Sequence, residues 1–199
     1  MDYRYLGLSG LKVSSYCLGT MTYGETTEEN DAHLQISEAF SSGINFIDTA
    51  EMYPTCPIRK ETSGETEKII GNWINNNKDK RKDIILATKV VGNGFKYIRN
   101  GGPITKETIK VALHGSLKRL KTDYIDLYQL HWPNRGSYHF RSYWNYKPEK
   151  QDSKNITDEF LDIINTLNDL KKEGLIRAIG VSNETCWGVM KLNEIIKEI

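Results

Sequence analysis

The stretch Ile44-Asn45-Phe46-Ile47-Asp48-Thr49-Ala50-Glu51-Met52-Tyr53 decides how the rest of this chain is interpreted. Its apolar first half predicts a short buried strand that ends in a carboxylate, and a phenol follows five residues later in the loop. An ionisable group at the end of a buried strand is costly to desolvate unless another group interacts with it. Asp48 and Tyr53 therefore either belong to one active site or are structural, with Asp48 capping the loop and Tyr53 packing at its rim.

Length and composition place the chain among folded globular proteins. It has 199 residues, of which 38% are hydrophobic and 27% charged. The formal net charge of +1 provides no bulk attraction to nucleic acid or to an anionic membrane. No apolar run approaches the roughly 18 residues of a membrane span, and the first ten residues lack the apolar core of a secretory signal. We therefore expect no nucleic acid and no membrane among its partners.

The cysteines and histidines point to a cytoplasmic protein without a metal site. The three cysteines are an odd number with no metal-type spacing, which fits reduced thiols. The four histidines include no pair at the spacing of zinc ligands.

Short apolar segments alternate with helical patterns along the chain. After a hairpin-like start around Ser9-Gly10, we predict strands at 16–20, 44–48, 84–89, 124–131 and 177–181, each followed by a loop and a helix. The helices are expected to begin near Thr26, Thr62, Thr105, Thr157 and Glu184, the first two with capping boxes completed by Glu29 and Glu65. This alternation is typical of a parallel sheet covered by helices.

The first predicted strand distinguishes between two parallel-sheet architectures. It is followed by Gly19-Thr20-Met21-Thr22-Tyr23-Gly24, which lacks the Gly-x-Gly-x-x-Gly of a dinucleotide-binding doubly wound sheet. Polar candidates stand instead at four strand ends, at Asp48, Lys89, His131 and Ser182-Asn183. Because a closed barrel brings all such ends to one rim, the pattern favours a (β/α) barrel over a doubly wound sheet.

The number of units is too small for a complete barrel. A (β/α)8 TIM barrel has eight strand–helix units and typically roughly 250 residues. This chain supplies about the first five units after its N-terminal hairpin. We therefore expect residues 1–199 to be the N-terminal portion of a single, longer TIM-barrel domain.

The polar groups at the strand ends suit one reaction. A phenol has a reference pKa of about 10 and donates a proton at neutral pH, and a nearby ammonium makes it a stronger acid. A carboxylate holds that ammonium in place, and an imidazole hydrogen-bonds a substrate oxygen and shares in the proton transfer. Tyr53, Lys89, Asp48 and His131 supply these four groups. The set suits protonation of a carbonyl oxygen, with a hydride from a nicotinamide cofactor because no side chain can supply one.

On these residues the chain resembles the aldo-keto reductase superfamily, barrel enzymes that reduce carbonyls with NADPH. The matching motifs are Gly19-Thr20-Met21, the stretch from Asp48 to Tyr53, Thr88-Lys89, Leu130-His131-Trp132-Pro133 and Gly180-Val181-Ser182-Asn183. Within the superfamily, Ala50 to Pro54 and Gly180 to Thr185 look most like the bacterial Tas-type reductases. The resemblance covers the whole chain and implies a TIM barrel of aldo-keto reductase type.

The resemblance also implies a role for each motif residue. Tyr53 would be the general acid, Lys89 and Asp48 would tune it, and His131 would orient the carbonyl. The residues implied in binding NADPH are Gly19, Thr20, Met21, Asp48, Ser182 and Asn183, and those implied in binding substrate are Tyr53, His131 and Trp132. Two alternatives stay open: Trp132 as a packed rim residue, and Ser182-Asn183 as a helix N-cap.

The implied function is hydride transfer from NADPH to an aldehyde or ketone, with a small-molecule carbonyl as substrate. A regulatory NADP-binding protein, like the potassium-channel β subunits of this superfamily, and an inactive truncated fragment are the alternatives. Family members also use a glutamine on the next strand and an Arg/Lys-bearing loop near the eighth strand to hold the cofactor. This chain ends before either, so we expect residues 1–199 alone to bind NADPH weakly or not at all.

Two polar segments lie outside these motifs. The insertion 134–156 carries Tyr138, Phe140, Tyr143, Trp144 and Tyr146 among Arg135, Arg141 and Lys147. We interpret it as a substrate lid, with a disordered loop or a nucleotide-stacking surface as alternatives. The basic run 78–82 is interpreted as a solvated surface turn.

The 199-residue chain is predicted to fold poorly or to associate. An incomplete barrel leaves strand edges unpaired and its inner face uncovered, and exposed edges promote association between chains. Sedimentation velocity combined with thermal melting tests this expectation. A sharp cooperative melt from a monodisperse monomer contradicts it.

Overall fold

A computed structural model describes residues 1–139 and 144–198 of the chain. Five parallel strands form one sheet whose order follows the sequence, β3-β4-β5-β6-β7. They are β3 (Cys17–Gly19), β4 (Phe46–Asp48), β5 (Ile85–Val90), β6 (Ile125–Leu130) and β7 (Ile176–Val181). The helices are α1 (Glu29–Ser41), α2 (Glu65–Asn76), α3 (Lys106–Leu120), α4 (Ser153–Lys172) and α5 (Cys186–Glu198). The predicted alternation of strand and helix is confirmed, and the result is a partial α/β barrel.

The central strand β5 is covered on both faces, as its near-continuous apolar sequence predicts. Every residue of the strand is buried. Leu86 and Val90 join the core that the sheet forms with the helices. Ile85 and Ala87 point the other way, into a second, smaller core on the inner face of the sheet.

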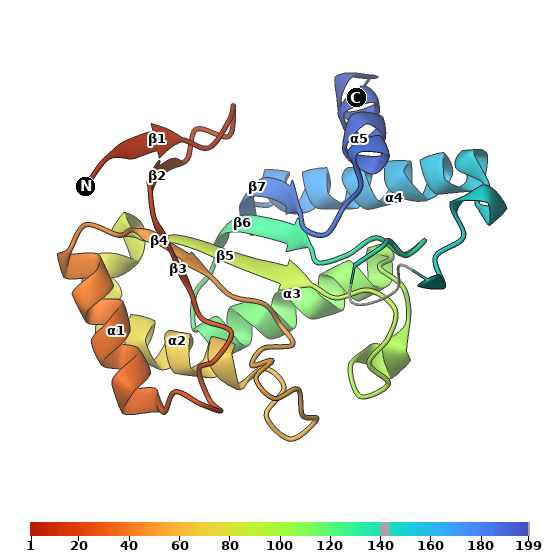
Figure 1. The fold of residues 1–199 in the computed structure, drawn as a ribbon. Coiled ribbons are helices and arrows are strands. Elements are labelled where there is room, and N and C mark those ends of the chain that lie inside the picture. Colours follow the sequence, from red (N-terminus) through yellow and green to blue (C-terminus); the bar gives the residue numbers. More distant parts are fainter. Residues whose placement is uncertain (140–143, 199) are drawn as a thin grey trace.

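The inner face is covered at one end by the N-terminal hairpin of β1 (Tyr3–Tyr5) and β2 (Lys12–Ser14). Leu11 and Val13 pack there with residues of β5, β6 and β7. Figure 1 shows this hairpin on the opposite side of the sheet from α1, α2 and α3. The candidate site lies at the carboxyl ends of the strands, away from the hairpin. Within the described residues, the edge strands β3 and β7 each pair with only one neighbour.

The first residues of the helices agree only in part with the starts predicted from the sequence. Thr105 caps α3 as predicted, accepting a hydrogen bond from the backbone of Thr108. The capping boxes predicted at Thr26 and Thr62 are wrong, because no side chain caps either α1 or α2. The Thr62 hydroxyl instead donates to the Glu25 carboxylate, at 2.7 Å.

The last two helices also begin at other residues than predicted. Helix α4 begins four residues before Thr157, because Asp152 accepts hydrogen bonds from two backbone amides of its first turn. Helix α5 begins at Cys186, two residues later than expected.

The basic run 78–82 is not a simple solvated turn. It forms a short 3-10 helix, η1 (Lys78–Asp83), and Arg81 is only 8% exposed. Its guanidinium pairs with the fully buried Asp126 at 2.9 Å and donates to two backbone carbonyls, of Ile84 and Tyr124. The partner carboxylate lies on β6, so the local sequence pattern contained no sign of it.

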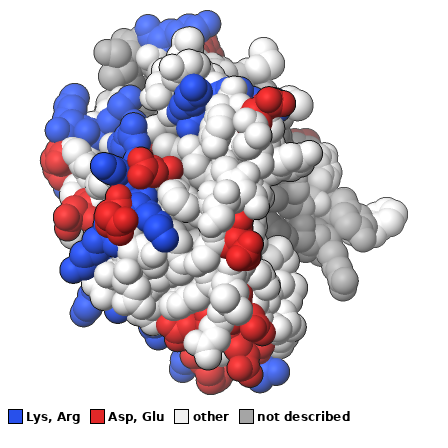
Figure 2. Space-filling view, turned by 90° about the vertical axis from the view of Figure 1, so that its left-hand side faces the viewer, with Lys and Arg blue, Asp and Glu red and all other residues white. Residues whose placement is uncertain are grey.

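Neither the surface charge in Figure 2 nor the hydropathy of the described helices is unusual for a globular chain. On the face in Figure 2, basic and acidic side chains lie side by side, so this face has no continuous basic surface. Among the residues that the structure describes, no helix is long and apolar enough to cross a membrane.

The Arg81–Asp126 pair is predicted to stabilise the sheet. Arg81→Met leaves the buried Asp126 with Arg177 as its remaining cation, and breaking a buried ion pair typically costs about 3–5 kcal/mol. We expect the free energy of unfolding of the protein at its natural full length, measured with urea, to fall by about 3 kcal/mol. Lys82→Met, at the exposed neighbouring position, is the control and changes it by less than about 0.5 kcal/mol. Equal effects of the two substitutions contradict the assignment.

Candidate active site

Four polar side chains from three neighbouring strands and their loops meet at the carboxyl ends of the sheet. Asp48 ends β4, Lys89 is the penultimate residue of β5, and His131 follows β6 directly. The loop after β4 carries Tyr53. The Lys89 ammonium donates to Asp48 Oδ2 at 2.6 Å and to Tyr53 Oη at 3.4 Å. The sheet therefore assembles the four residues as the parallel order predicts.

The Lys89 ammonium is far more enclosed than the Asp48 carboxylate with which it pairs. Its side chain is only 6% exposed, against 29% for Asp48. A third acceptor, the backbone carbonyl of Thr49, lies 2.8 Å from Nζ. A buried ammonium is tolerated only where acceptors replace its water, and these three fix its position between the carboxylate and the phenol.

His131 completes the group as a buried, neutral imidazole. Its ring lies edge-on to Tyr53, with centroids 5.7 Å apart. Burial first, and the neighbouring Lys89 charge second, together lower the pKa of His131 from the ordinary 6.5 to about 3. His131 Nδ1 has no hydrogen-bond partner among the described residues. The imidazole is thus suited to hydrogen bonding at neutral pH and not to carrying a positive charge.

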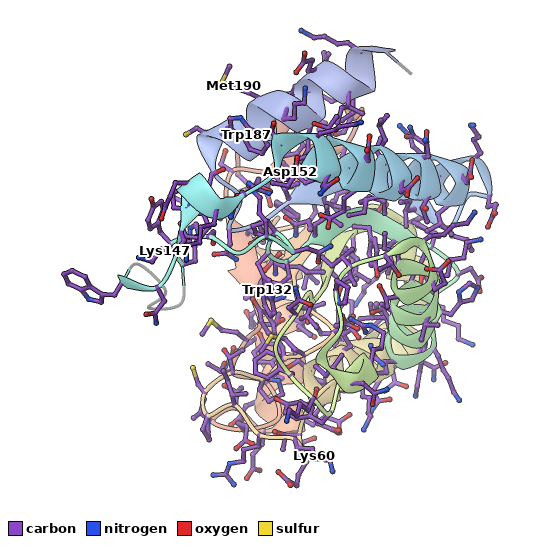
Figure 3. The ribbon with its side chains drawn as sticks, turned by 90° about the vertical axis from the view of Figure 1, so that its right-hand side faces the viewer. Lys60, Trp132, Lys147, Asp152, Trp187 and Met190 are labelled. Atoms are coloured by element: carbon purple, nitrogen blue, oxygen red, sulfur yellow. The ribbon has the colours of Figure 1, made fainter. Side chains whose placement is uncertain are left out.

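A cavity of about 700 Å³ opens beside these residues. Tyr53, His131 and Trp132 line it, together with apolar side chains that include Met52, Ile58 and Phe95. Trp132 both lines the cavity and is held in place, because its indole N–H donates to the Asn93 carbonyl at 3.1 Å. Figure 3 shows Trp132 between the loop that carries Lys60 and the segment that carries Lys147 and Asp152.

The residues implied in cofactor binding are placed unequally. Met21, Ser182 and Asn183 line the cavity. Thr20 is fully buried, donates its hydroxyl to the Asp48 carbonyl and does not line the cavity. Gly19 is paired with Asp48 in the sheet and does not line the cavity. The structure therefore brings three of the six to the cavity surface, while Asp48 is bound to Lys89.

The loop after β7 is tied to the His131 segment. The Asn183 amide donates to the His131 carbonyl at 2.8 Å, and Asn183 adopts a left-handed backbone with φ of 53°. The N-cap of α5 is Thr185, whose hydroxyl accepts from the Gly188 amide at 3.2 Å. The alternative of Ser182-Asn183 as the cap is therefore wrong, and both side chains remain at the cavity.

Sequence reasoning missed one polar residue of the inner face. The Gln129 amide, from β6, donates to Asp48 Oδ1 at 3.2 Å. It has room because its neighbour across the strands is Gly180, where a Cβ would lie 3.0 Å from Gln129 Cγ. The available indication was a polar residue at the same alternating positions as Leu127 and His131.

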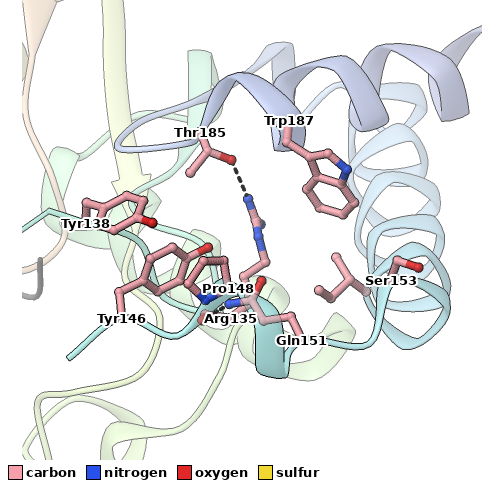
Figure 4. A pocket seen from close by; sticks show the side chains of 9 residues that line it. Arg135, Tyr138, Tyr146, Pro148, Gln151, Ser153, Thr185 and Trp187 are labelled. Carbon is pink, nitrogen blue, oxygen red and sulfur yellow. Dashed lines mark hydrogen bonds between the residues drawn. The ribbon is translucent and has the colours of Figure 1, made fainter. Parts of the chain in front are cut away.

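The insertion 134–156 lines the cavity beside Tyr53 and also a cavity next to α5. Gly136, Ser137 and His139 line the cavity beside Tyr53, which agrees with the interpretation as a lid. Farther along, Tyr138 and Tyr146 face Trp187 of α5 across a separate cavity of about 380 Å³ (Figure 4). Three residues named in the sequence interpretation, Phe140, Arg141 and Tyr143, lie outside the described residues.

The sequence of this chain matches a known protein family. The Aldo/keto reductase family model matches residues 16–198. This chain belongs to the aldo/keto reductase family.

Relatives extend the match along nearly the whole chain. Protein tas of Escherichia coli is 44% identical over 194 residues, which is 96% of this chain and 54% of that protein. Norsolorinic acid reductase B of Dothistroma septosporum is 30% identical over 211 residues, covering 100% of this chain and 46% of that protein. This aldo/keto reductase chain therefore spans about half the length of the curated relatives that it matches.

A solved structure shares the fold. The holo form of aldo-keto reductase AKR11C1 from Bacillus halodurans superposes with a TM-score of 0.73 and 35% identity, over 98% of this chain and 54% of its own. The prediction of a partial barrel of aldo-keto reductase type is therefore confirmed. The roles of individual site residues stay predictions.

The buried His131 predicts a pH dependence of stability. Its pKa of about 3 in the folded chain lies below the ordinary value of 6.5, so the unfolded chain binds more protons between these pH values. The contribution of His131 to the free energy of unfolding is fully present above about pH 6.5. It is lost as the pH decreases toward 3, by up to about 1.4 kcal/mol per pH unit. In the protein at its natural full length, the free energy of unfolding measured with urea should depend less steeply on pH in His131→Leu than in the unsubstituted protein. His114→Leu, which replaces an exposed histidine of α3, is the control, and an unchanged slope in His131→Leu contradicts the assignment.

Proposed function

We propose that this chain carries the proton-transfer site of an NADPH-dependent carbonyl reductase, an enzyme that transfers a hydride to an aldehyde or ketone. One observation carries the proposal: the Lys89 ammonium contacts both the Asp48 carboxylate and the Tyr53 hydroxyl at the wall of a cavity. Membership of the aldo/keto reductase family supports it.

The residues at the cavity fit a nicotinamide. Met21, Ser182 and Asn183 line one side of it, where the two polar side chains would hydrogen-bond the carboxamide of the cofactor. Tyr53 and His131 line the same cavity, so a carbonyl beside a nicotinamide held there would lie within their reach. When bound, the nicotinamide supplies the hydride, which no side chain can provide.

Each protein group then has a separate part in protonating the carbonyl oxygen. Tyr53 donates the proton from Oη as general acid. The Lys89 ammonium stabilises the phenolate that remains, and Asp48 keeps that ammonium in position. The neutral imidazole of His131 orients the carbonyl by a hydrogen bond, because a positive charge is unfavourable at its buried position.

The cavity also indicates the type of substrate. Its lining is mainly apolar, with Met52, Ile58, Phe95 and Trp132 among the side chains. The proposed partner is accordingly a small-molecule carbonyl compound with an apolar body. A reducing, cytoplasmic location is part of the proposal, since the three cysteines are free thiols.

Tyr53→Phe tests the general acid in the protein at its natural full length. Removing the proton donor should lower kcat for aldehyde reduction by about 100- to 10,000-fold, while NADPH affinity, measured by fluorescence titration, stays within about twofold because the ring is kept. Tyr5→Phe, on the exposed hairpin, is the control. Turnover that survives in Tyr53→Phe contradicts the assignment. NADPH binding without turnover in the unsubstituted protein supports the regulatory alternative instead.

A further inference from the structure

A further buried ion pair joins the loop that carries Tyr53 to the loop that follows Lys89 and β5. Glu51 lies in the loop after β4, and Arg99 lies in the loop after β5. The guanidinium holds the carboxylate with two hydrogen bonds, of 2.5 Å from Nη1 and 2.7 Å from Nη2. The Glu51 side chain is 4% exposed and the Arg99 side chain 15%. This bidentate geometry fixes both position and orientation.

Both partners also bind the backbone of one residue, Val91. The Val91 amide donates to Glu51 Oε1 at 2.6 Å, and Arg99 Nη2 donates to the Val91 carbonyl at 2.9 Å. The Glu51 amide itself donates to the Lys89 carbonyl at 3.2 Å. Glu51 is therefore attached to the β5 chain on both sides of Val90, by its backbone and by its side chain.

The residues joined by these bonds are close in sequence to Tyr53 and Lys89. Glu51 stands two residues before Tyr53, and Val91 stands two residues after Lys89. The tie thus connects the chain that carries the phenol to the chain that carries the ammonium. We propose that Glu51 and Arg99 are positioning residues that set the separation between Tyr53 Oη and Lys89 Nζ, an inference that rests on the reductase function proposed above.

Energetics make a purely stabilising role for this pair a weak explanation. Burial raises the pKa of Glu51, although the Arg99 hydrogen bonds oppose the shift. Apolar residues of similar volume in place of a buried ion pair are often as stable or more stable. The bidentate pair offers what an apolar pair lacks, namely directional bonds to the Val91 amide and carbonyl.

A matched pair at the opposite end of the same strand provides the control. Asp126, fully buried on β6, accepts from the Leu86 amide of β5 at 3.0 Å and pairs with Arg81. Arg81 also donates to a backbone carbonyl beside β5, that of Ile84. Each ion pair therefore ties a buried carboxylate to a backbone amide of the β5 segment. Asp126 and Arg81 lie away from the proposed chemistry, which Glu51–Arg99 adjoins.

The experiment compares Glu51→Leu/Arg99→Met with Asp126→Leu/Arg81→Met in the protein at its natural full length. Removing both charges of each pair avoids leaving one buried charge without its partner. We expect the Glu51/Arg99 variant to lose about 10- to 100-fold in kcat, since small displacements of reacting groups have effects of this size. NADPH affinity should stay within about twofold. The control variant should keep kcat within about threefold.

Crystal structures of both variants supply a measurement that does not depend on turnover. The separation of Tyr53 Oη and Lys89 Nζ should lengthen from 3.4 Å in the Glu51/Arg99 variant and stay unchanged in the control. An unchanged separation, or equal loss of kcat in both variants, overturns the inference. If the separation lengthens but the unsubstituted protein reduces no carbonyl, the positioning role stands and the proposed function fails.

Discussion

The buried Lys89 ammonium is the constraint on which the arrangement of the site depends. An enclosed cation needs acceptors in place of water, and here they come from Asp48, from the Thr49 backbone and from Tyr53. All three acceptors lie on β4 or its loop, while the cation lies on β5. Satisfying one charge therefore fixes the loop after β4 against the neighbouring strand, and the parallel order of the sheet makes this possible.

The two faces of β5 have different surroundings, because one packs against the helices and the other leads to the candidate site. On β5 the residues that face the helices are apolar or hydrogen-bonded within the core, and Leu86 and Val90 belong to it. The opposite face runs from Ile85 and Ala87, under the hairpin, to Lys89 at the cavity. On the inner face of β5 the charged side chain stands near the carboxyl end, where Asp48 and Tyr53 meet it. This arrangement lets a charged group occupy a buried strand without disturbing the helix layer.

The sequence predicts what depends on local pattern and misses what depends on distant partners. Apolar runs located the strands, and because each run ended in a polar residue, Asp48, Lys89 and His131 were identified together. The cap at Thr62 failed because its hydroxyl is taken by Glu25, which belongs to another loop. Arg81 appeared solvated because its counter-ion, Asp126, follows 45 residues later and comes near it only in the folded sheet. Glu51 and Arg99 are likewise distant in sequence and gave no local indication of pairing.

The same ammonium also separates the roles of its two ring neighbours. A positive imidazole at His131 is opposed by burial first and by the Lys89 charge second, so its pKa lies near 3. A group that stays neutral at physiological pH cannot release a proton by losing a charge, but it can still hydrogen-bond a carbonyl oxygen. Tyr53, which touches the ammonium directly, gives up its proton to leave an anion beside a cation. In the proposed reaction, Lys89 therefore favours proton donation by the phenol and excludes it from the imidazole.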